Sequence, residues 1–138
     1  MNILLTGFTG NIGQAVAEAL ADARLLAVVR DASTAPRRAN VEFVAGSLED
    51  LSEIRTEEIE VIIHGAANTS FTAPLETLRE TNVHGTARML AFAARCPRLQ
   101  RFIHLSTTCV SGTTAGFIRY LVDAPRASAS LNQTLGAG

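Results

Sequence analysis

The sequence predicts an α/β protein, a doubly wound parallel sheet that stops after about the fifth strand. Short apolar runs alternate with stretches of helical periodicity, which is the pattern of strands and helices in a parallel sheet. A glycine-rich turn joins the first apolar run to the first periodic stretch. The chain has 138 residues, of which 47% are apolar and 18% charged. This size and composition suit one domain with a buried core.

The first part of the chain predicts a strand, a helix and two further strands. The apolar run Asn2–Thr6 is typical of a buried strand, and residues 11–23 form a helix because their apolar positions recur with helical spacing. Leu25–Val29 and Val41–Ala45 are the second and third strands. Residues 30–40 between them contain a proline and several polar residues, so we expect a loop with at most one helical turn.

The next part predicts two more strands, separated by a long helix. The charged segment 48–58 is expected to be a short crossover helix that leads to the fourth strand, Val61–His64. Pro74 suits a first helical position and opens a helix to about Arg95. Arg101–Ser106 is the fifth strand. Right-handed crossovers then place the successive strands in one sheet.

Charge and hydropathy exclude several partners and compartments. The net charge of -1 provides no basic surface for nucleic acid or an anionic membrane. No apolar run approaches the roughly 18 residues of a membrane span. The N-terminal MNILLTG lacks the basic and apolar regions of a signal peptide. We therefore expect a cytoplasmic protein.

The basic residues and the cysteines limit the chemistry. All 12 basic residues are arginine, which excludes any mechanism that needs a lysine ammonium group from this chain. Cys96 and Cys109 form no C-x-x-C pair, and neither has a histidine at metal-ligand spacing. We expect no metal site and no disulfide framework.

A glycine turn predicts a dinucleotide cofactor. Thr6-Gly7-Phe8-Thr9-Gly10-Asn11-Ile12-Gly13 follows the first strand and opens the first helix. Gly7 permits a tight turn, Gly10 lets a diphosphate approach the backbone, and Gly13 lets helix and strand pack closely. The N–H groups at the helix start favour a pyrophosphate. We expect a Rossmann-like fold with cofactor contacts from Thr6, Gly7, Thr9, Gly10, Asn11, Ile12 and Gly13. The alternative is a turn with a purely structural role.

Four motifs occur in order over residues 3–112. They are the G-x-x-G-x-x-G turn, His64-Gly65-Ala66-Ala67, Asn82-Val83-His84-Gly85-Thr86 and Ser106-Thr107-Thr108-Cys109-Val110-Ser111-Gly112. Together they resemble the extended short-chain dehydrogenase/reductase family, which includes NAD-dependent epimerases and dehydratases. The stretch HGAANTSFTAPLETLRETNVHGT, with LSTTCVSG after it, is most similar to the fatty-acyl and thioester reductase-like (male sterility) branch.

The resemblance implies roles for residues at the carboxyl ends of the fourth and fifth strands. Ala66 and Ala67 would lie beside the cofactor ribose, and Asn82 would brace the active-site backbone. Thr107, after Ser106, stands where the family has its catalytic Ser or Thr. Its hydroxyl could donate a hydrogen bond to a substrate carbonyl as hydride arrives. His64 is expected to be a strand-end histidine and not a catalyst.

The end of the second strand bears on the choice of cofactor. An acidic residue there would bind a ribose 2′-hydroxyl, whereas arginine would bind a 2′-phosphate. Arg30 comes first and Asp31 follows, so we expect NADP, with NAD less favoured. A surface cluster of arginines is the alternative. Ser47 and Leu48 follow the third strand and are expected near the adenine, although the family often has Asp at the position of Ser47.

Several functions remain open at this point. The first is that the chain is the NAD(P)-binding portion of an oxidoreductase whose complete form reduces an activated acyl or carbonyl substrate with NADPH. The alternatives are a fragment of a sugar-nucleotide epimerase or dehydratase, a non-catalytic NADP-binding module, and an incomplete gene product. The family's Tyr-x-x-x-Lys pair is absent, since Tyr120 is followed by Ala124 at the lysine position. The chain alone is therefore expected to be inactive.

Composition divides the chain into two parts. We expect residues 1–112 to form an NAD(P)-binding domain, and residues 113–138 to form a tail to which the sequence assigns no element. The substrate-binding region of the family is not recognised in the tail. An exposed edge of the sheet is expected to favour self-association.

Overall fold

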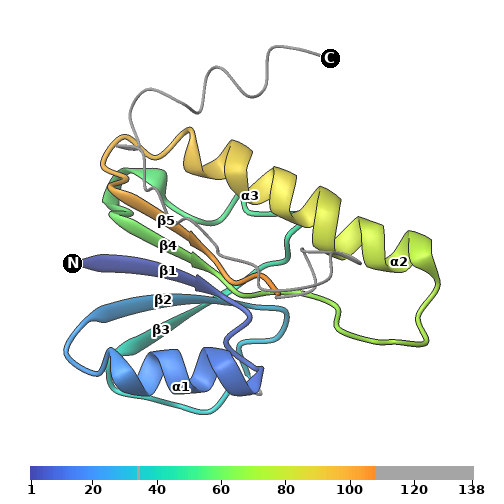
Figure 1. Cartoon of the computed structure of the whole chain (residues 1–138). Coiled ribbons are helices and arrows are strands. Elements are labelled where there is room, and N and C mark those ends of the chain that lie inside the picture. The colour runs from blue at the N-terminus through green and yellow to red at the C-terminus, as the bar shows by residue number, and fades with distance from the viewer. Residues whose placement is uncertain (34, 108–138) are drawn as a thin grey trace, which may run out of the picture. The chain divides into compact units, whose positions relative to one another are not determined.

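The computed structural model describes residues 1–33 and 35–107 and contains one parallel sheet. Its strands are β1 (Asn2–Thr6), β2 (Arg24–Val29), β3 (Val41–Ala45), β4 (Val61–His64) and β5 (Arg101–His104). Their spatial order is β3-β2-β1-β4-β5, and every neighbouring pair is parallel (Figure 1). The predicted fold class is thereby confirmed. In this order the chain changes direction between β1 and β4, which is where open α/β sheets bind their ligands.

Helices cover both faces of the sheet (Figure 1). The helix α1 (Asn11–Ala19) lies on one face. A continuous helical segment covers the other face, formed by α2 (Leu75–Arg79), the π-helical turn η2 (Glu80–His84) and α3 (Gly85–Ala93). This arrangement is the doubly wound architecture.

Side chains along β1 point alternately to the two faces of the sheet, so the core has one part on each face. Ile3 and Leu5 are buried in the cluster that includes Ala17 of α1. Leu4 points the other way and is buried with Met89 and Phe92 of α3. Successive strand residues point to opposite faces, so a central strand that is covered on both sides must be apolar throughout.

The first helix is shorter than the predicted 11–23. It ends at Ala19, and the chain then turns into β2, which begins one residue earlier than expected. The Asn40 amide donates hydrogen bonds to the carbonyl oxygens of Ala17, at 3.4 Å, and Leu20, at 3.1 Å. A residue distant in sequence therefore satisfies carbonyl groups at the helix end, which helical periodicity does not reveal.

The predicted crossover helix over 48–58 was wrong. Only a single 3-10 turn, η1 (Thr56–Glu58), forms there. Ser47 Oγ accepts bonds from two backbone N–H groups, at 3.1 and 3.3 Å, and the Asp50 carboxylate accepts one from Ser52 N–H at 3.0 Å. These local bonds compete with a helical backbone.

The predicted long helix and fifth strand also differ in detail. Pro74 precedes α2 as its N-terminal cap residue, the π-helical turn interrupts the helix, and α3 ends at Ala93. The fifth strand ends at His104, earlier than predicted. Across the residues that the structure describes, no helix is long and apolar enough to cross a membrane.

The chain divides into two compact units, Met1–Leu105 and Ser106–Gly138. The sheet and its helices belong to the first unit. The predicted boundary at Gly112 lies outside the described residues.

Candidate dinucleotide-binding site

A cavity of about 770 Å³ opens at the carboxyl ends of β1 to β4. It is lined by Thr6, Gly7, Thr9, Gly10, Val28, Arg30, Ser47, Leu48, Glu49, Gly65, Ala66, Ala67, Asn68, Thr69, Ser70, Glu80 and Thr81. The predicted residues Thr6, Gly7, Thr9, Gly10, Arg30, Ser47, Leu48, Ala66 and Ala67 are among them. Parallel strands bring these sequence-distant residues to one edge of the sheet.

The turn after β1 packs directly on the turn after β4. Gly7 has a φ of 81°, in the left-handed region that glycine adopts most easily. A Cβ atom on Gly7 would lie 2.5 Å from the carbonyl carbon of Gly65. Both the conformation and the close approach therefore require glycine at this position.

The other two glycines of the turn have different surroundings. A Cβ atom on Gly13 would lie 2.2 Å from the Gly7 carbonyl oxygen and 2.6 Å from Phe8 Cα. The same atom on Gly10 would meet only the Gly7 oxygen, at an ordinary 3.5 Å. Gly13 is thus needed for packing of α1 on the turn, whereas Gly10 lines the cavity.

The start of α1 is a favourable place for a phosphate. Gly10 precedes the helix, and no side chain caps it, so the first backbone N–H groups have no side-chain acceptor. Such groups at the positive end of a helix bind anions. Asn11 and Ile12 stand at this start, and Ile12 is exposed. Neither residue is among those that line the cavity, and their predicted cofactor contacts stay predictions.

The wall near β2 and β3 carries a positive side chain. Arg30 follows β2, is exposed, and lines the cavity. The Asp31 carboxylate accepts bonds from the backbone N–H of Ser33 at 2.9 Å and from its hydroxyl at 2.6 Å. Ser47 Oγ donates to the Glu49 carboxylate at 3.0 Å. The hydroxyl expected near the adenine is therefore engaged with a neighbouring acid.

Asn82 braces the loop after β4 without lining the cavity. Its Oδ1 accepts a bond from Asn68 N–H at 2.8 Å, and its Nδ2 donates to the Asn68 carbonyl at 2.9 Å. Asn68 does line the cavity. Asn82 therefore holds the backbone of the cavity wall from η2, and its predicted role toward a cofactor stays a prediction.

His64 lies fully buried at the end of β4. Its Nδ1 contacts Thr6 Oγ1 at 2.7 Å and its Nε2 contacts Thr86 Oγ1 at 3.2 Å. Burial, and next the neighbouring His104, lower the pKa of His64 to about 4. The imidazole is therefore neutral at physiological pH and is not exposed to a ligand.

Two predicted residues fall in the second unit. Ser106 and Thr107 come directly after Leu105, and both are exposed. The remainder of their motif, which includes Cys109, lies outside the described residues, and so does Tyr120. The catalytic role of Thr107 and the cofactor contact of Ser106 stay predictions.

Part of the cavity lining was not predicted from the sequence. Asn68, Thr69 and Ser70 directly follow the two alanines at the end of β4, so their place at the strand's carboxyl end was available as a signal. Glu80 and Thr81 reach the cavity from the π-helical turn. No periodic pattern marks such a turn, and nothing in the sequence indicated these two residues.

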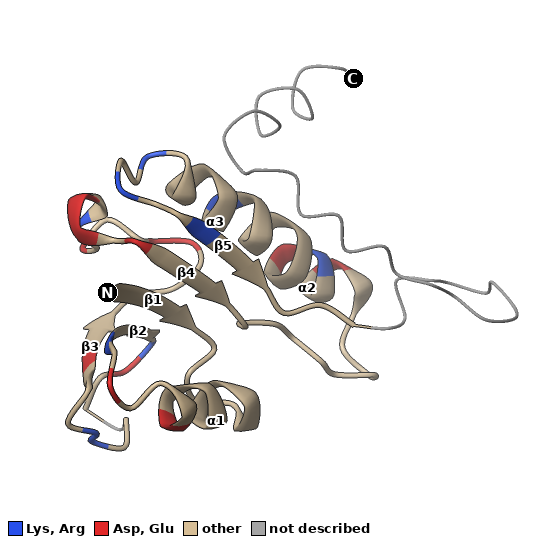
Figure 2. Cartoon of the chain, turned by 60° about the vertical axis from the view of Figure 1, so that its left-hand side comes forward, with Lys and Arg blue, Asp and Glu red and all other residues tan. Residues whose placement is uncertain are grey.

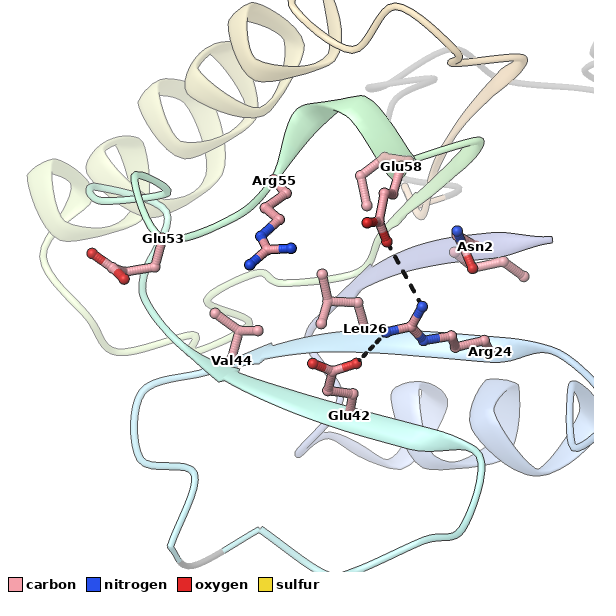
Figure 3. A pocket seen from close by; sticks show the side chains of 10 residues that line it. Asn2, Arg24, Leu26, Glu42, Val44, Glu53, Arg55 and Glu58 are labelled. Atoms are coloured by element: carbon pink, nitrogen blue, oxygen red, sulfur yellow. Dashed lines mark hydrogen bonds and ion pairs between the residues drawn. The ribbon is translucent and has the colours of Figure 1, made fainter.

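A second cavity, of about 370 Å³, lies toward the amino ends of the strands (Figure 3). There Arg24 pairs with Glu42 at 2.8 Å and with Glu58 at 3.7 Å. Arg55 and Glu53 also line it, so carboxylates outnumber guanidinium groups. With this charge and without a glycine turn, the second cavity does not suit a pyrophosphate.

The charged residues outside these two cavities form no candidate metal site in the part of the chain that the structure describes. Acidic and basic residues are interspersed along the ribbon (Figure 2). Within residues 1–33 and 35–107, no three His, Cys, Asp or Glu side chains come together as potential metal ligands.

Comparison with known proteins identifies the family. The family model described as male sterility protein matches residues 45–135, more than half of the chain. Fatty acyl-CoA reductase 2, chloroplastic, of Arabidopsis thaliana is 33% identical over 79 residues, which cover 57% of this chain and 12% of that protein.

Solved structures share the fold. The terminal R domain of the myxalamid PKS-NRPS pathway has a TM-score of 0.70 and 30% identity, and the match covers 84% of this chain and 37% of that one. A UDP-N-acetylglucosamine 4-epimerase of Methanobrevibacter ruminantium M1 has a TM-score of 0.73 at 18% identity, a similarity of fold alone, and covers 88% and 42%. The chain spans less than half the length of each of these three proteins. By the match of the family model over residues 45–135, the chain belongs to the male sterility protein family of NAD-binding domains.

Proposed function

We propose that the chain is the NADP-binding part of an oxidoreductase that reduces an activated acyl group, such as a thioester, with hydride from NADPH. The observation that carries this proposal is the cavity at the carboxyl edge of the sheet, with the glycine turn on one side and Arg30 on another. The relative named fatty acyl-CoA reductase 2 supports the acyl substrate class.

The preference for NADP depends on Arg30. Its guanidinium group lines the cavity where the adenosine ribose of a bound dinucleotide would lie, and it can form bidentate bonds to a 2′-phosphate. Asp31 does not line the cavity, and Ser33 donates two hydrogen bonds to its carboxylate. These contacts favour a phosphate over a hydroxyl at the 2′-position.

Calorimetric titration of NADPH and NADH tests this preference. Arg30→Ala should weaken NADPH binding by about tenfold or more, because hydrogen bonds to charged groups contribute about 1.5–3 kcal/mol. Binding of NADH should be unchanged. Arg37→Ala is the matched control, because Arg37 is exposed but does not line the cavity, and it should alter neither affinity. Comparable affinities of the wild type for both cofactors contradict the NADP preference.

The hydroxyl of Thr107 is the proposed catalytic group. When hydride adds to the carbonyl carbon, negative charge moves to the oxygen, and a positioned O–H donor stabilises it. We expect Thr107→Val to abolish NADPH oxidation by acyl thioesters in a form of the protein that carries the substrate region, whereas Thr107→Ser should retain it. Equal rates for both variants contradict this role.

A non-catalytic NADP-binding module is the second candidate. The chain contains no lysine, and Ala124 stands four residues after Tyr120, its single tyrosine. This function predicts tight NADPH binding without NADPH oxidation by any acyl thioester, even at high protein concentration. Measurable turnover by the chain alone contradicts it.

A further inference from the structure

Five polar groups form a continuous chain of hydrogen bonds beside the cavity. Ala66 N–H donates to Thr6 Oγ1 at 3.2 Å, and Thr6 Oγ1 lies 2.7 Å from His64 Nδ1. On the other side of the ring, His64 Nε2 lies 3.2 Å from Thr86 Oγ1, and this hydroxyl donates to the Asn82 carbonyl at 2.7 Å. These hydrogen bonds thus connect the ends of β1 and β4 to η2 and α3.

The groups at the two ends of this hydrogen-bond chain determine which atom donates in each hydrogen bond. The Asn82 carbonyl can only accept, and it takes the single hydroxyl proton of Thr86. Thr86 Oγ1 must therefore accept from His64 Nε2–H. A neutral imidazole carries one N–H, so Nδ1 is unprotonated and accepts the hydroxyl proton of Thr6. Thr6 then accepts from Ala66 N–H with a lone pair, and every group has a partner.

The opposite tautomer leaves a conflict at both threonines. If Thr86 donated to Nε2, its oxygen would face the Asn82 carbonyl at 2.7 Å without a proton between them. If Nδ1 carried the proton, Thr6 Oγ1 would accept two bonds, and its own hydroxyl proton would have no acceptor in this chain. His64 and Thr6 are both almost completely buried, where an unpaired polar group is costly.

We propose that His64 is a positioning residue, fixed as the Nε2–H tautomer, that sets the cavity wall between Ala66 and Asn68. At one end of the hydrogen-bond chain, the backbone N–H of Ala66 is held against β1. At the other end, the backbone of Asn82 is held, and the side chain of Asn82 binds Asn68 with two hydrogen bonds. Ala66 and Asn68 both line the cavity. The effect on cofactor binding rests on the proposed function, whereas the tautomer and the wall geometry do not.

Nitrogen NMR of the full chain with labelled histidine tests the tautomer without any cofactor. At neutral pH, His64 should show a protonated Nε2 and an unprotonated Nδ1. His64, His84 and His104 are the three histidines of the chain, and His84→Gln and His104→Gln assign the signals. A protonated Nδ1, or an equal mixture of tautomers, overturns the assignment.

A pair of substitutions at Thr86 tests the positioning role. Thr86→Ser keeps the hydroxyl and should preserve the wild-type behaviour within about twofold. Thr86→Val has a similar shape but cannot accept from Nε2–H, so the buried His64 ring loses an acceptor, and such a loss corresponds to an effect of about tenfold. The amides of Ala66 and Asn68 should therefore exchange with solvent about tenfold faster in Thr86→Val than in Thr86→Ser.

The same two substitutions test whether the position of the cavity wall affects cofactor binding. NADPH affinity should fall about tenfold in Thr86→Val and be kept in Thr86→Ser. Equal amide exchange in both variants, each with cooperative unfolding, overturns the positioning role whatever the cofactor affinities. Failure of the wild type to bind NADPH or NADH contradicts the proposed function instead, since amide exchange and the tautomer are measured on the free protein.

Discussion

His64 connects burial of a single ring to the pH dependence of the whole domain. Its pKa is lowered from 6.5 to about 4 by burial and then by His104, whose ring stacks on it at 5.3 Å. Thr6 from β1, Thr86 from α3 and Phe102 from β5 also face the ring. Acid therefore protonates this histidine in the unfolded chain before it does so in the folded one.

We expect stability to fall as the pH falls from about 6.5 to about 4. Above this window both states hold neutral His64, and its contribution is constant. Within this window the unfolded state binds more protons than the folded state, and the free energy of unfolding falls by up to about 3 kcal/mol. Urea unfolding at several pH values measures the slope. His64→Gln should flatten it, whereas His84→Gln, at an exposed histidine, should leave it unchanged. An unaltered slope in His64→Gln contradicts the prediction.

The glycine turn allows packing and binding to be separated. Gly13→Ala should cost at least about 2 kcal/mol of stability, because its methyl group would overlap the Gly7 carbonyl. Gly10→Ala has room in the protein and should cost no more than about 1 kcal/mol at this cap position.

Gly10→Ala, which costs little stability, should have the clear effect on cofactor binding. Gly10→Ala should weaken NADPH binding although the protein remains folded, because its methyl group stands where the diphosphate approaches the backbone. Thermal unfolding and calorimetric titration of both variants check the two effects. A Gly10→Ala variant that unfolds as easily as Gly13→Ala contradicts the separation.

At the scale of elements, helix ends were harder to predict than helix positions. Apolar periodicity located α1 and the helical segment from α2 to α3 because one face of each packs on the sheet. It did not locate the end of α1, which depends on Asn40, far away in sequence. The short helix expected over the charged segment 48–58 does not form, although apolar side chains such as Leu51 and Ile54 are buried there.

The amide of Asn40 is expected to stabilise the end of α1. Asn40→Asp replaces the donor by a carboxylate that faces two carbonyl oxygens, so we expect a loss of about 1–3 kcal/mol. Ala39→Asp adds the same charge at the neighbouring, exposed position and should change stability little. Chemical unfolding followed by circular dichroism compares the two. Equal losses would mean that the charge, and not the hydrogen bonds, matters.

At the scale of the molecule, the edge of the sheet formed by β5 favours association with another copy of the chain. No strand of the described residues pairs with the outer side of β5, and Ile103 on this strand is 42% exposed. Unpaired apolar edge strands favour contact with another copy of the chain.

We predict concentration-dependent self-association of the chain, measurable by sedimentation. Ile103→Lys should reduce it, because a charge on an edge strand opposes pairing. Leu75→Lys, at an exposed apolar residue of α2, should leave it unchanged. A wild-type chain that stays monomeric at high concentration contradicts the prediction.

The sequence predicted the sheet and about half of the cavity lining for the same reason. Short apolar runs mark the parallel strands, and ligand-facing residues follow directly at their carboxyl ends, as Gly7 and Ala66 do. Residues that reach the cavity by another route, such as Thr81 in the π-helical turn, carry no such signal. The contacts of His64 were equally hidden, because they depend on four elements meeting.

The central place of β1 has a consequence for the order of folding. β1 pairs with β2 across a short connection, Leu4 opposite Leu26, but with β4 only across a long one, Leu4 opposite Ile62. The entropy of closing a loop grows with its length, so the pairing of β1 with β2 should precede that with β4. During synthesis the glycine turn is made first, yet it gains its opposite wall only after β4 has emerged. The nucleotide cavity therefore cannot form before β4 has paired, and a nascent chain should bind no cofactor until the fourth strand is in place.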